Sequence, residues 1–281
     1  MPWHATLALD YRSSAGPAGS RRTVAHFRHD GPLRILQSLY PEGDGICHNV
    51  LVHPPGGLVG GDVLDIRIDV GAGAHGLATT PGASRFYRSD GERALQHSRI
   101  AVGEGGRFEW LPLEALCFDG CLAENRLEFT LAPGAQLIGW DMTALGLPHA
   151  GQPFRRGSLL QHIEWPGVWL ERGRIAADDA RLLDGPLGLA GHRCLASVFL
   201  ASGTPLGREA REQALDAARA VIDAHGLRAT AGATSPDGRI VVVRALAPVV
   251  EPAMQLMKQV RAAWREACWQ LPATAPRIWA M

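Results

Sequence analysis

Residue types that bind transition metals gather in the first third of the chain, among apolar strand-like segments. Imidazole and thiolate are good ligands for nickel and zinc. A closed structural zinc site needs four ligands at paired short spacings, and the chain offers one such pair, Cys117 and Cys121. We therefore expect no tight metal site. The weak candidates for metal ligands are Cys47, His48, His53 and His75.

Four acids lie beside apolar strand residues, where a bare charge is costly to bury. Each of them either pairs with an arginine, such as Arg85, Arg88 or Arg174, or lines solvent. For any single acid, pairing is favoured. A transient metal path would need such acids along a wet cavity, and it would leave no regular motif. The four acids are Asp62, Glu114, Asp141 and Glu171.

Common catalytic motifs are missing from the sequence. There is no Gly-x-Ser-x-Gly elbow and no His-Glu-x-x-His. The glycine-rich stretch 56–61 is followed by Asp62 and a strand pattern, whereas a phosphate-binding loop needs Lys, Ser or Thr and a helix. We expect no catalytic residue and no nucleotide site. The alternative from another class is a metal-assisted hydrolase that uses the His and Asp residues of this central loop.

The central loop lies between two predicted strands. The first, 50–52, ends at Pro54 and Pro55, which cannot donate to a sheet. The second, 64–70, alternates apolar and charged residues with a period of two. Paired glycines between them indicate a backbone with positive φ or one pressed against another segment. A strand over 75–80 and a further loop lead to the charged and aromatic run 84–88.

A geometric repeat predicts the fold class. Glycine turns near residues 73, 105 and 134 each separate two strand patterns. The interval of roughly thirty residues favours stacked antiparallel β-strands in a β-helix-like, solenoidal pile, although an up-and-down sheet would give the same pattern. Further strands are expected at 3–11, 22–28, 159–165, 168–175, 195–201 and 240–243, with a loop at 13–20.

Two helices are expected in the C-terminal third of this mainly β chain. Thr204 as N-cap, Pro205 at the first position and Gly226 at the end would bound one helix. A second spans about 251–269. We expect one domain over 1–281, in which a helix–strand–helix portion at about 204–271 packs on a β-rich body at about 1–203.

Bulk properties narrow the possible partners and compartment. The 281 residues are 46% hydrophobic and 20% charged, with a formal net charge of zero. Duplex binding needs a basic surplus, so nucleic acid is not the expected partner. No apolar run is long enough to cross a bilayer and none resembles a secretory signal, so no membrane partner is expected. Five scattered cysteines favour a reducing, cytoplasmic compartment.

Several segments together resemble the urease accessory protein UreD (UreH) family. They are HPPGGLVGGD at 53–62, TTPGASRFYRS at 79–89, GPLRILQSLYPEG at 31–43, LPLEALCF at 111–118, GWDMTALG at 139–146 and PRIW at 276–279. The chain departs from the family pattern at one place. Where LGR and then GE are usual, it has Leu147 and Gln152, and so lacks an arginine and a carboxylate.

The resemblance implies a non-enzymatic chaperone for urease maturation. Such proteins bind the urease apoprotein and UreF, which recruits the GTPase UreG, and GTP hydrolysis belongs to that partner. Nickel is thought to cross an internal passage, with no tightly bound cofactor. The acids named above are the candidates for a nickel path. The candidates for partner contact or for the passage are His53, Gly56, Gly57, Gly60, Gly61, Asp62, Thr79, Thr80, Arg85, Tyr87 and Arg88.

Overall fold

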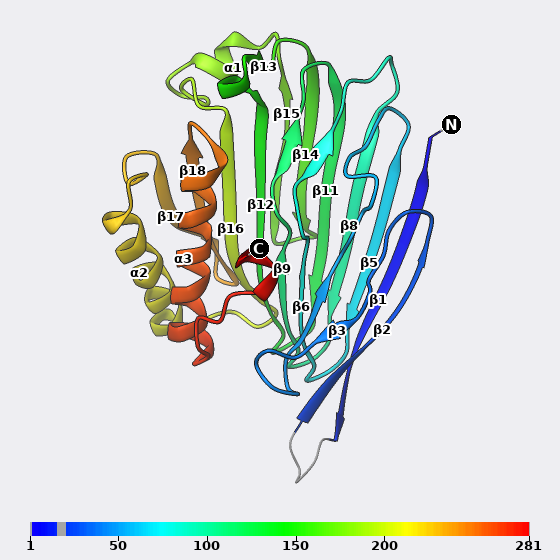
Figure 1. The fold of residues 1–281 in the computed structure, drawn as a ribbon. Helices are drawn as coiled ribbons and strands as arrows, with labels where there is room; N and C mark the ends of the chain where they lie inside the picture. Colours follow the sequence, from blue (N-terminus) through cyan, green and yellow to red (C-terminus); the bar gives the residue numbers. More distant parts are fainter. Residues whose placement is uncertain (1, 16–20, 281) are drawn as a thin grey trace.

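The computed structural model describes residues 2–15 and 21–280. Of the expected loop at 13–20, residues 13–15 belong instead to the first strand, and residues 16–20 lie outside the described part. Two β-sheets face each other, and helices cover the outer face of one of them (Figure 1). The seven-stranded sheet has the order β15 (Trp169–Ala176), β14 (Gly157–Trp165), β11 (Cys121–Leu131), β8 (Ala94–Val102), β5 (Val63–Val70), β1 (His4–Ala15) and β2 (Arg21–Asp30).

The second sheet has eleven strands. Its main path runs through β17 (Ala231–Asp237), β18 (Ile240–Ala247), β16 (Cys194–Ser202), β12 (Gln136–Leu147), β9 (Arg107–Leu111), β6 (His75–Thr79), β4 (Cys47–Val50) and β3 (Ser38–Leu39). Three short strands lie beside this path. They are β7 (Ser84–Phe86), β10 (Ala115–Cys117) and β13 (Gln152–Pro153).

The chain winds between the two sheets as a solenoid, which confirms the expected mainly β, helix-like pile. Successive coils place β5, β8, β11 and β14 side by side in one sheet and β6, β9 and β12 in the other. Pairing between coils is parallel, and antiparallel pairs such as β1 with β2 and β14 with β15 lie at the ends. The expected antiparallel direction is therefore wrong for the coils, because each coil re-enters a sheet in the same direction.

The glycine turns that suggested the repeat lie where successive coils change sheet. Gly73, Gly105 and Gly134 have φ values of 64°, 61° and 71°, a left-handed conformation that favours glycine. The turns also stack, since the Gly73 amide donates to the Glu104 carbonyl and the Gly105 amide to the Pro133 carbonyl. The period read from the sequence is thus the period of the coils.

Alternation along the strands builds a core between the sheets. In β5, Leu64, Ile66, Ile68 and Val70 are buried, and Arg67 between them is exposed, as the period of two predicted. β12 is buried along almost its whole length because it lies in the central layer, with a sheet on one face and helices on the other.

A second core lies between the eleven-stranded sheet and the two longer helices, α2 (Arg208–Ala224) and α3 (Val250–Trp269). A short helix α1 (Ala180–Asp184) and two 3-10 turns, η2 (Pro148–Ala150) and η3 (Arg277–Ala280), complete the fold. The expected 251–269 helix and its buried stripe of Met254, Met257, Val260 and Trp264 are confirmed.

The predicted start of the first helix is wrong. α2 begins at Arg208, four residues beyond Thr204, with Gly207 as its N-cap. The Thr204 hydroxyl is already used, because it accepts the Gly134 amide at 2.9 Å and so ties this segment to a coil turn. At the other end His225, rather than Gly226, is the C-cap.

Candidate functional site

The central glycine-rich loop and the run 84–89 lie against each other. The Leu58 amide donates to the Arg85 carbonyl at 2.7 Å, and the Tyr87 amide donates to the Leu58 carbonyl at 2.8 Å. Leu58 thus forms a parallel bridge with Phe86, and both side chains are fully buried. The two segments that carry most of the family resemblance form one surface of the protein.

The paired glycines have two different roles: some have positive φ, and others lie close against a neighbouring segment. Gly56 and Gly61 have positive φ values of 73° and 87°. Gly57 and Gly60 are close to the neighbouring segment instead. A Cβ on Gly57 would lie 2.2 Å from the Tyr87 ring, and one on Gly60 would lie 2.2 Å from the Ser89 hydroxyl. The loop therefore needs glycine for its own turns and for contact with 85–92.

Asp62 fixes the end of this loop. Its carboxylate is buried and accepts the Val59 amide at 2.9 Å and the Trp3 amide at 2.7 Å. The expectation that this acid pairs with an arginine or lines solvent is wrong, since backbone amides satisfy both of its oxygens. His53 lies nearby, where burial lowers its pKa and the Asp62 charge partly offsets that effect. With both oxygens engaged, Asp62 is poorly placed to bind a metal for hydrolysis.

The exposed side chains of this surface are aromatic and basic. Arg85 and Arg88 are exposed, and Tyr87, which is 37% exposed, packs on Phe118 with ring centroids 5.0 Å apart. A surface groove of 490 Å³ begins here, and Gln152, one of the two positions that depart from the family pattern, lies in its lining. The other departing residue, Leu147, lines a separate pocket of 320 Å³.

Thr79 and Thr80 have structural partners. The Thr79 hydroxyl donates to the Leu111 carbonyl at 2.6 Å and accepts the indole N–H of Trp279 at 3.0 Å. The Thr80 hydroxyl donates to the Gly82 carbonyl and accepts the Leu113 amide, both at 2.9 Å. Thr79 therefore holds the C-terminal segment, whose Trp279 ring also stacks on Trp140.

A row of amide side chains crosses the space between the sheets. Gln96, Asn125 and Gln161 are in register on β8, β11 and β14 and point inward. Ser84 donates to Gln96 at 3.1 Å, and Gln96 donates to Asn125 at 3.3 Å. We call this row the polar seam, together with the residues that continue it on the far side. Asp141 accepts a hydrogen bond from the row, Ser197 is opposite Asp141 in strand register, and Ser197 donates to Glu171. The members of the polar seam are Ser84, Gln96, Asn125, Asp141, Gln161, Glu171 and Ser197.

Asp141 is the buried carboxylate of the polar seam. It accepts hydrogen bonds from Asn125, at 2.6 Å, and from Gln161. Burial raises its pKa to about 6, and the nearby Glu171 charge adds to this, although the two amide hydrogen bonds oppose it. No cation neutralises it among the described residues, since both its partners are neutral amides. Asp141 is therefore able to exchange a proton near neutral pH.

Glu171 ends the polar seam at the solvent. Its carboxylate accepts two hydrogen bonds from Arg244, at 2.7 and 3.0 Å, and one from Ser197 at 3.4 Å. The pairing with an arginine is thus confirmed for Glu171, although the partner is not Arg174. At the other end, the Glu114 carbonyl accepts the Ser84 amide at 2.9 Å. Glu114 lines the 320 Å³ pocket beside Cys194 and Glu251.

Two of the histidines proposed as metal ligands belong to a buried ionic cluster on the opposite face of the eleven-stranded sheet. His48 contacts Glu42 at 2.9 Å, and His75 lies 3.6 Å from Glu109. Arg261 and Arg265 of α3 both bind Glu109, and Arg265 also binds Glu42. We call these six residues the arginine cluster. Burial alone would raise the pKa of Glu109, but Arg261 and the other partners hold it at about 2.

The remaining sulfur candidates are buried thiols. Burial raises the pKa of Cys47, whose sulfur lies 3.6 Å from the Asn49 side chain. Contact with Cys121 and burial both raise the pKa of Cys117. The candidate ligands Cys47, His48, His53 and His75 are therefore divided between the core, the arginine cluster and the central loop.

Sequence reasoning missed the amides of the polar seam and the arginine cluster. A signal for the first existed, because Gln96, Asn125 and Gln161 occupy the inward positions of alternating strands, where apolar residues are the rule. The arginine cluster gave no such signal, since Glu109 and Arg265 are 156 residues apart.

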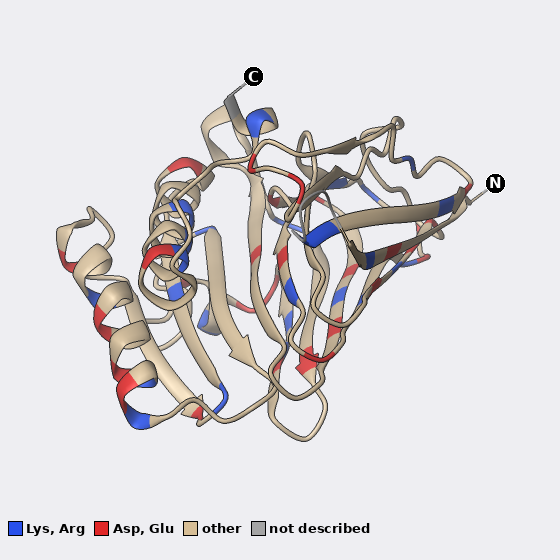
Figure 2. Ribbon diagram, turned by 90° about the horizontal axis from the view of Figure 1, so that it is seen from below, with Lys and Arg blue, Asp and Glu red and all other residues tan. Residues whose placement is uncertain are grey.

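These features define a class of protein. The protein is a β-solenoid with a polar seam in its interior. On its surface, the glycine-rich loop lies beside exposed arginine and tyrosine side chains. In the described residues, no helix is long and apolar enough to cross a membrane. Acidic and basic residues are interspersed along the strands and helices (Figure 2).

Comparisons with known proteins agree with this class. The family model described as UreD urease accessory protein matches residues 4–280. Proteins named urease accessory protein UreD are similar along the whole chain: one from Polaromonas naphthalenivorans is 68% identical over 281 residues, covering 100% of both chains. The homologue from Variovorax paradoxus is 68% identical over 280 residues, and that from Leptothrix cholodnii is 56% identical over 279. This chain belongs to the UreD urease accessory protein family, and its role is in urease maturation.

Proposed function

We propose that this chain is a scaffold and nickel conduit in urease maturation. It binds the urease apoprotein and UreF, reaches the GTPase UreG through UreF, and performs no GTP hydrolysis itself. Membership of the UreD family supports the setting. The single observation that supports the conduit is the polar seam. It is hydrogen-bonded from Ser84, whose amide contacts the Glu114 carbonyl, to Asp141, and strand register then places Ser197 and its partner Glu171 beside Asp141.

The chemistry of the polar seam suits an ion in transit. Carboxylate and amide oxygens bind nickel more weakly than imidazole or thiolate, so an ion would be held briefly and released. Asp141, with its pKa raised to about 6, would exchange a proton for the ion. Glu171 would form one mouth of the passage, and Glu114 the other. Asp62 contributes indirectly in this proposal, by holding the central loop in shape.

Isosteric variants of the two seam acids test the conduit. We expect Asp141→Asn and Glu171→Gln to lower the nickel content of urease activated in their presence several-fold, while co-purification with UreF and urease persists. Asp65→Asn, on the outer face and paired with Arg99, is the matched control and should behave as the wild type. Urease loaded fully by both seam variants would contradict the conduit.

The central loop and the run 84–89 are the proposed contact surface for a partner. Gly57→Ala should weaken co-purification, because its new methyl group would meet the Tyr87 ring and push the loop away. Gly82→Ala is the control, since no atom lies within 4 Å of the added carbon and its φ is ordinary. Equal recovery of UreF and urease by both variants would argue for a different contact surface. A wild-type chain that binds neither protein would contradict the scaffold itself.

A further inference from the structure

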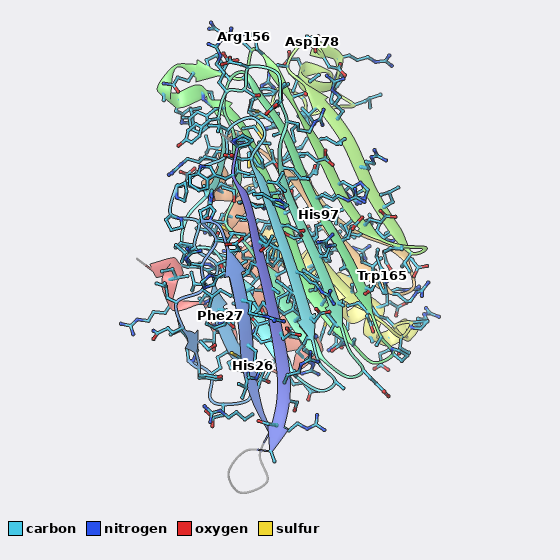
Figure 3. All side chains as sticks on the ribbon, turned by 90° about the vertical axis from the view of Figure 1, so that its right-hand side faces the viewer. His26, Phe27, His97, Arg156, Trp165 and Asp178 are labelled. Atoms are coloured by element: carbon cyan, nitrogen blue, oxygen red, sulfur yellow. The ribbon has the colours of Figure 1, made fainter. Side chains whose placement is uncertain are left out.

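The outer face of the seven-stranded sheet carries a group of side chains that the polar seam does not include. Figure 3 looks onto this face, with His97 labelled near its middle. Glu128 of β11 and His162 and Glu164 of β14 each present a ligand atom there, and these three atoms lie within 4.8 Å of one another. The set consists of one imidazole and two carboxylates, which are donors for a divalent transition metal.

The strand register explains why these residues meet. β11 and β14 run parallel, and Glu128 is directly opposite Glu164. His162 is two residues before Glu164, and so lies on the same face of the same strand. Two carboxylates in directly opposed positions repel each other, and a cation between them would remove that repulsion.

Two arginines flank the group in strand register, Arg99 opposite Glu128 and Arg172 opposite His162, and among the described residues neither forms an ion pair with its carboxylates. Arg126 and His97 both contact the Glu128 carboxylate, His97 at a distance of 3.0 Å. Glu164 contacts His162 at 2.7 Å, and Leu170 occupies the next position on β15. The only basic partner that Glu164 has among the described residues is therefore an imidazole, which can give its lone pair to a metal.

We propose that Glu128, His162 and Glu164 form a binding site for a divalent transition-metal ion on the outer face of the solenoid. Tetrahedral coordination places ligand atoms about 3.3 Å apart, so the three atoms would move closer together when the ion binds. His97 orients Glu128 from outside the ligand set. The His162 side chain is 8% exposed, against 25% and 30% for Glu128 and Glu164, so the ion sits between a buried imidazole and solvent. Water fills the remaining coordination positions, and the ion exchanges readily.

This site does not depend on the proposed conduit. It lies on the opposite face of the sheet from Gln96, Asn125 and Gln161, since strand residues alternate between the two faces. It also differs from the arginine cluster, where two guanidinium groups surround the carboxylates and repel a cation. In the outer-face group, Arg126 is the one arginine among the described residues that contacts a carboxylate.

Calorimetric titration of the untagged full-length chain with Zn²⁺ tests the proposal. We expect one ion per chain, and a loss of affinity of at least about tenfold in His162→Ala and in Glu164→Gln. His26→Ala is the matched control, because His26 is an exposed histidine on the outer face of the same sheet, at edge strand β2. Its affinity should equal that of the wild type. Thermal unfolding of each variant shows whether the fold is kept.

A second variant separates a built site from adsorption of ions to surface acids. Arg126→Met removes the cation that competes for Glu128, and should raise the affinity several-fold. The visible spectrum of bound Co²⁺ should change between wild type and Glu164→Gln, because one carboxylate ligand is lost. A wild-type chain without a stoichiometric Zn²⁺ site would overturn the proposal. Binding that is unchanged in both His162→Ala and Glu164→Gln would place the ion elsewhere and overturn it equally.

Discussion

The two faces of the eleven-stranded sheet each bury a carboxylate, but the partners of the two carboxylates differ. Toward the other sheet, Asp141 has only neutral amides as partners, and its pKa rises to about 6. Toward the helices, Glu109 has Arg261 and Arg265 as partners, and its pKa falls to about 2. Both carboxylates are shielded from solvent, so burial does not explain the difference. The partners do, because guanidinium groups stabilise the ionised form and neutral amides stabilise it less.

The arginine cluster therefore acts as a structural clamp, whereas Asp141 belongs to a site that can change its charge. The arginine cluster joins α3 to β9 and to the C-terminal segment, since Arg261 and Arg265 also donate to the carbonyls of Thr274 and Pro272. The Glu109 carboxylate is ionised throughout the physiological pH range, because its pKa is about 2. The pKa of Asp141, raised to about 6, lies close to that range, so its protonation state can change there. The arginine cluster therefore has the properties of a structural clamp, and the polar seam has those that the proposed conduit requires.

Breaking the arginine cluster should have the largest effect on stability. Glu109→Gln leaves two buried guanidinium groups without their shared carboxylate, so we expect a loss of about 3–5 kcal/mol in the free energy of unfolding. Urea unfolding at neutral pH measures it. Glu212→Gln, which removes an exposed pair with Arg208 on α2, should cost less than about 0.5 kcal/mol. Equal losses in the two variants would show that the cluster is not a clamp.

The pH dependence should have opposite signs in the two regions. The pKa of Asp141 is about 6 in the folded protein against 3.8 for the free side chain, so its stabilising effect is complete below 3.8 and is lost as pH rises through 6. Glu109, lowered from 4.5 to about 2, stabilises the fold above 4.5, and that effect is lost as pH falls through 2.

Asp141→Asn isolates the first of these effects. Relative to the variant, the wild type should lose on the order of 3 kcal/mol of unfolding free energy between about pH 4 and pH 8. Urea unfolding of both proteins across this range gives the difference directly. A difference that does not vary with pH would mean that Asp141 is paired like Glu109, and the contrast between the two regions would disappear.

The fold was largely predictable because its signals are local. The period of two along β5, the glycine turns at 73, 105 and 134, and the α3 stripe each depend on residues close together in sequence. Pairing direction was not predictable in this way. A turn followed by a strand gives the same sequence pattern in two cases. The strand can pair with the one before it, or it can cross to a second sheet. The start of α2 was missed for a similar reason, since Thr204 bonds to Gly134, 70 residues away.

The candidate site was predictable only in part. The sequence marks the central loop and the run 84–89 as site segments but does not pair them, and the structure places them together. Of the four acids, Asp141 and Glu171 share the polar seam, whereas Asp62 belongs to the loop. A carboxylate's partner decides its role, and the partners come from other coils: Gln161 for Asp141, and Arg244 for Glu171. No spacing in the sequence indicates these pairs.

The smallest expected effect concerns the mouth of the polar seam. Glu171→Gln should change stability by less than about 1 kcal/mol, because the pair with Arg244 is 28% and 45% exposed and water screens it. The same change should lower the pKa of Asp141, since the Glu171 charge raises it. The difference in unfolding free energy between Glu171→Gln and the double variant that also carries Asp141→Asn reports the pKa of Asp141. The pH at which this difference changes should be lower than the corresponding pH in the wild type. The control is Asp237→Asn, which breaks a similarly exposed pair with Arg239 and should leave the pKa of Asp141 unchanged. An unshifted dependence in Glu171→Gln would mean that the two acids are not coupled and that the polar seam ends before it reaches solvent.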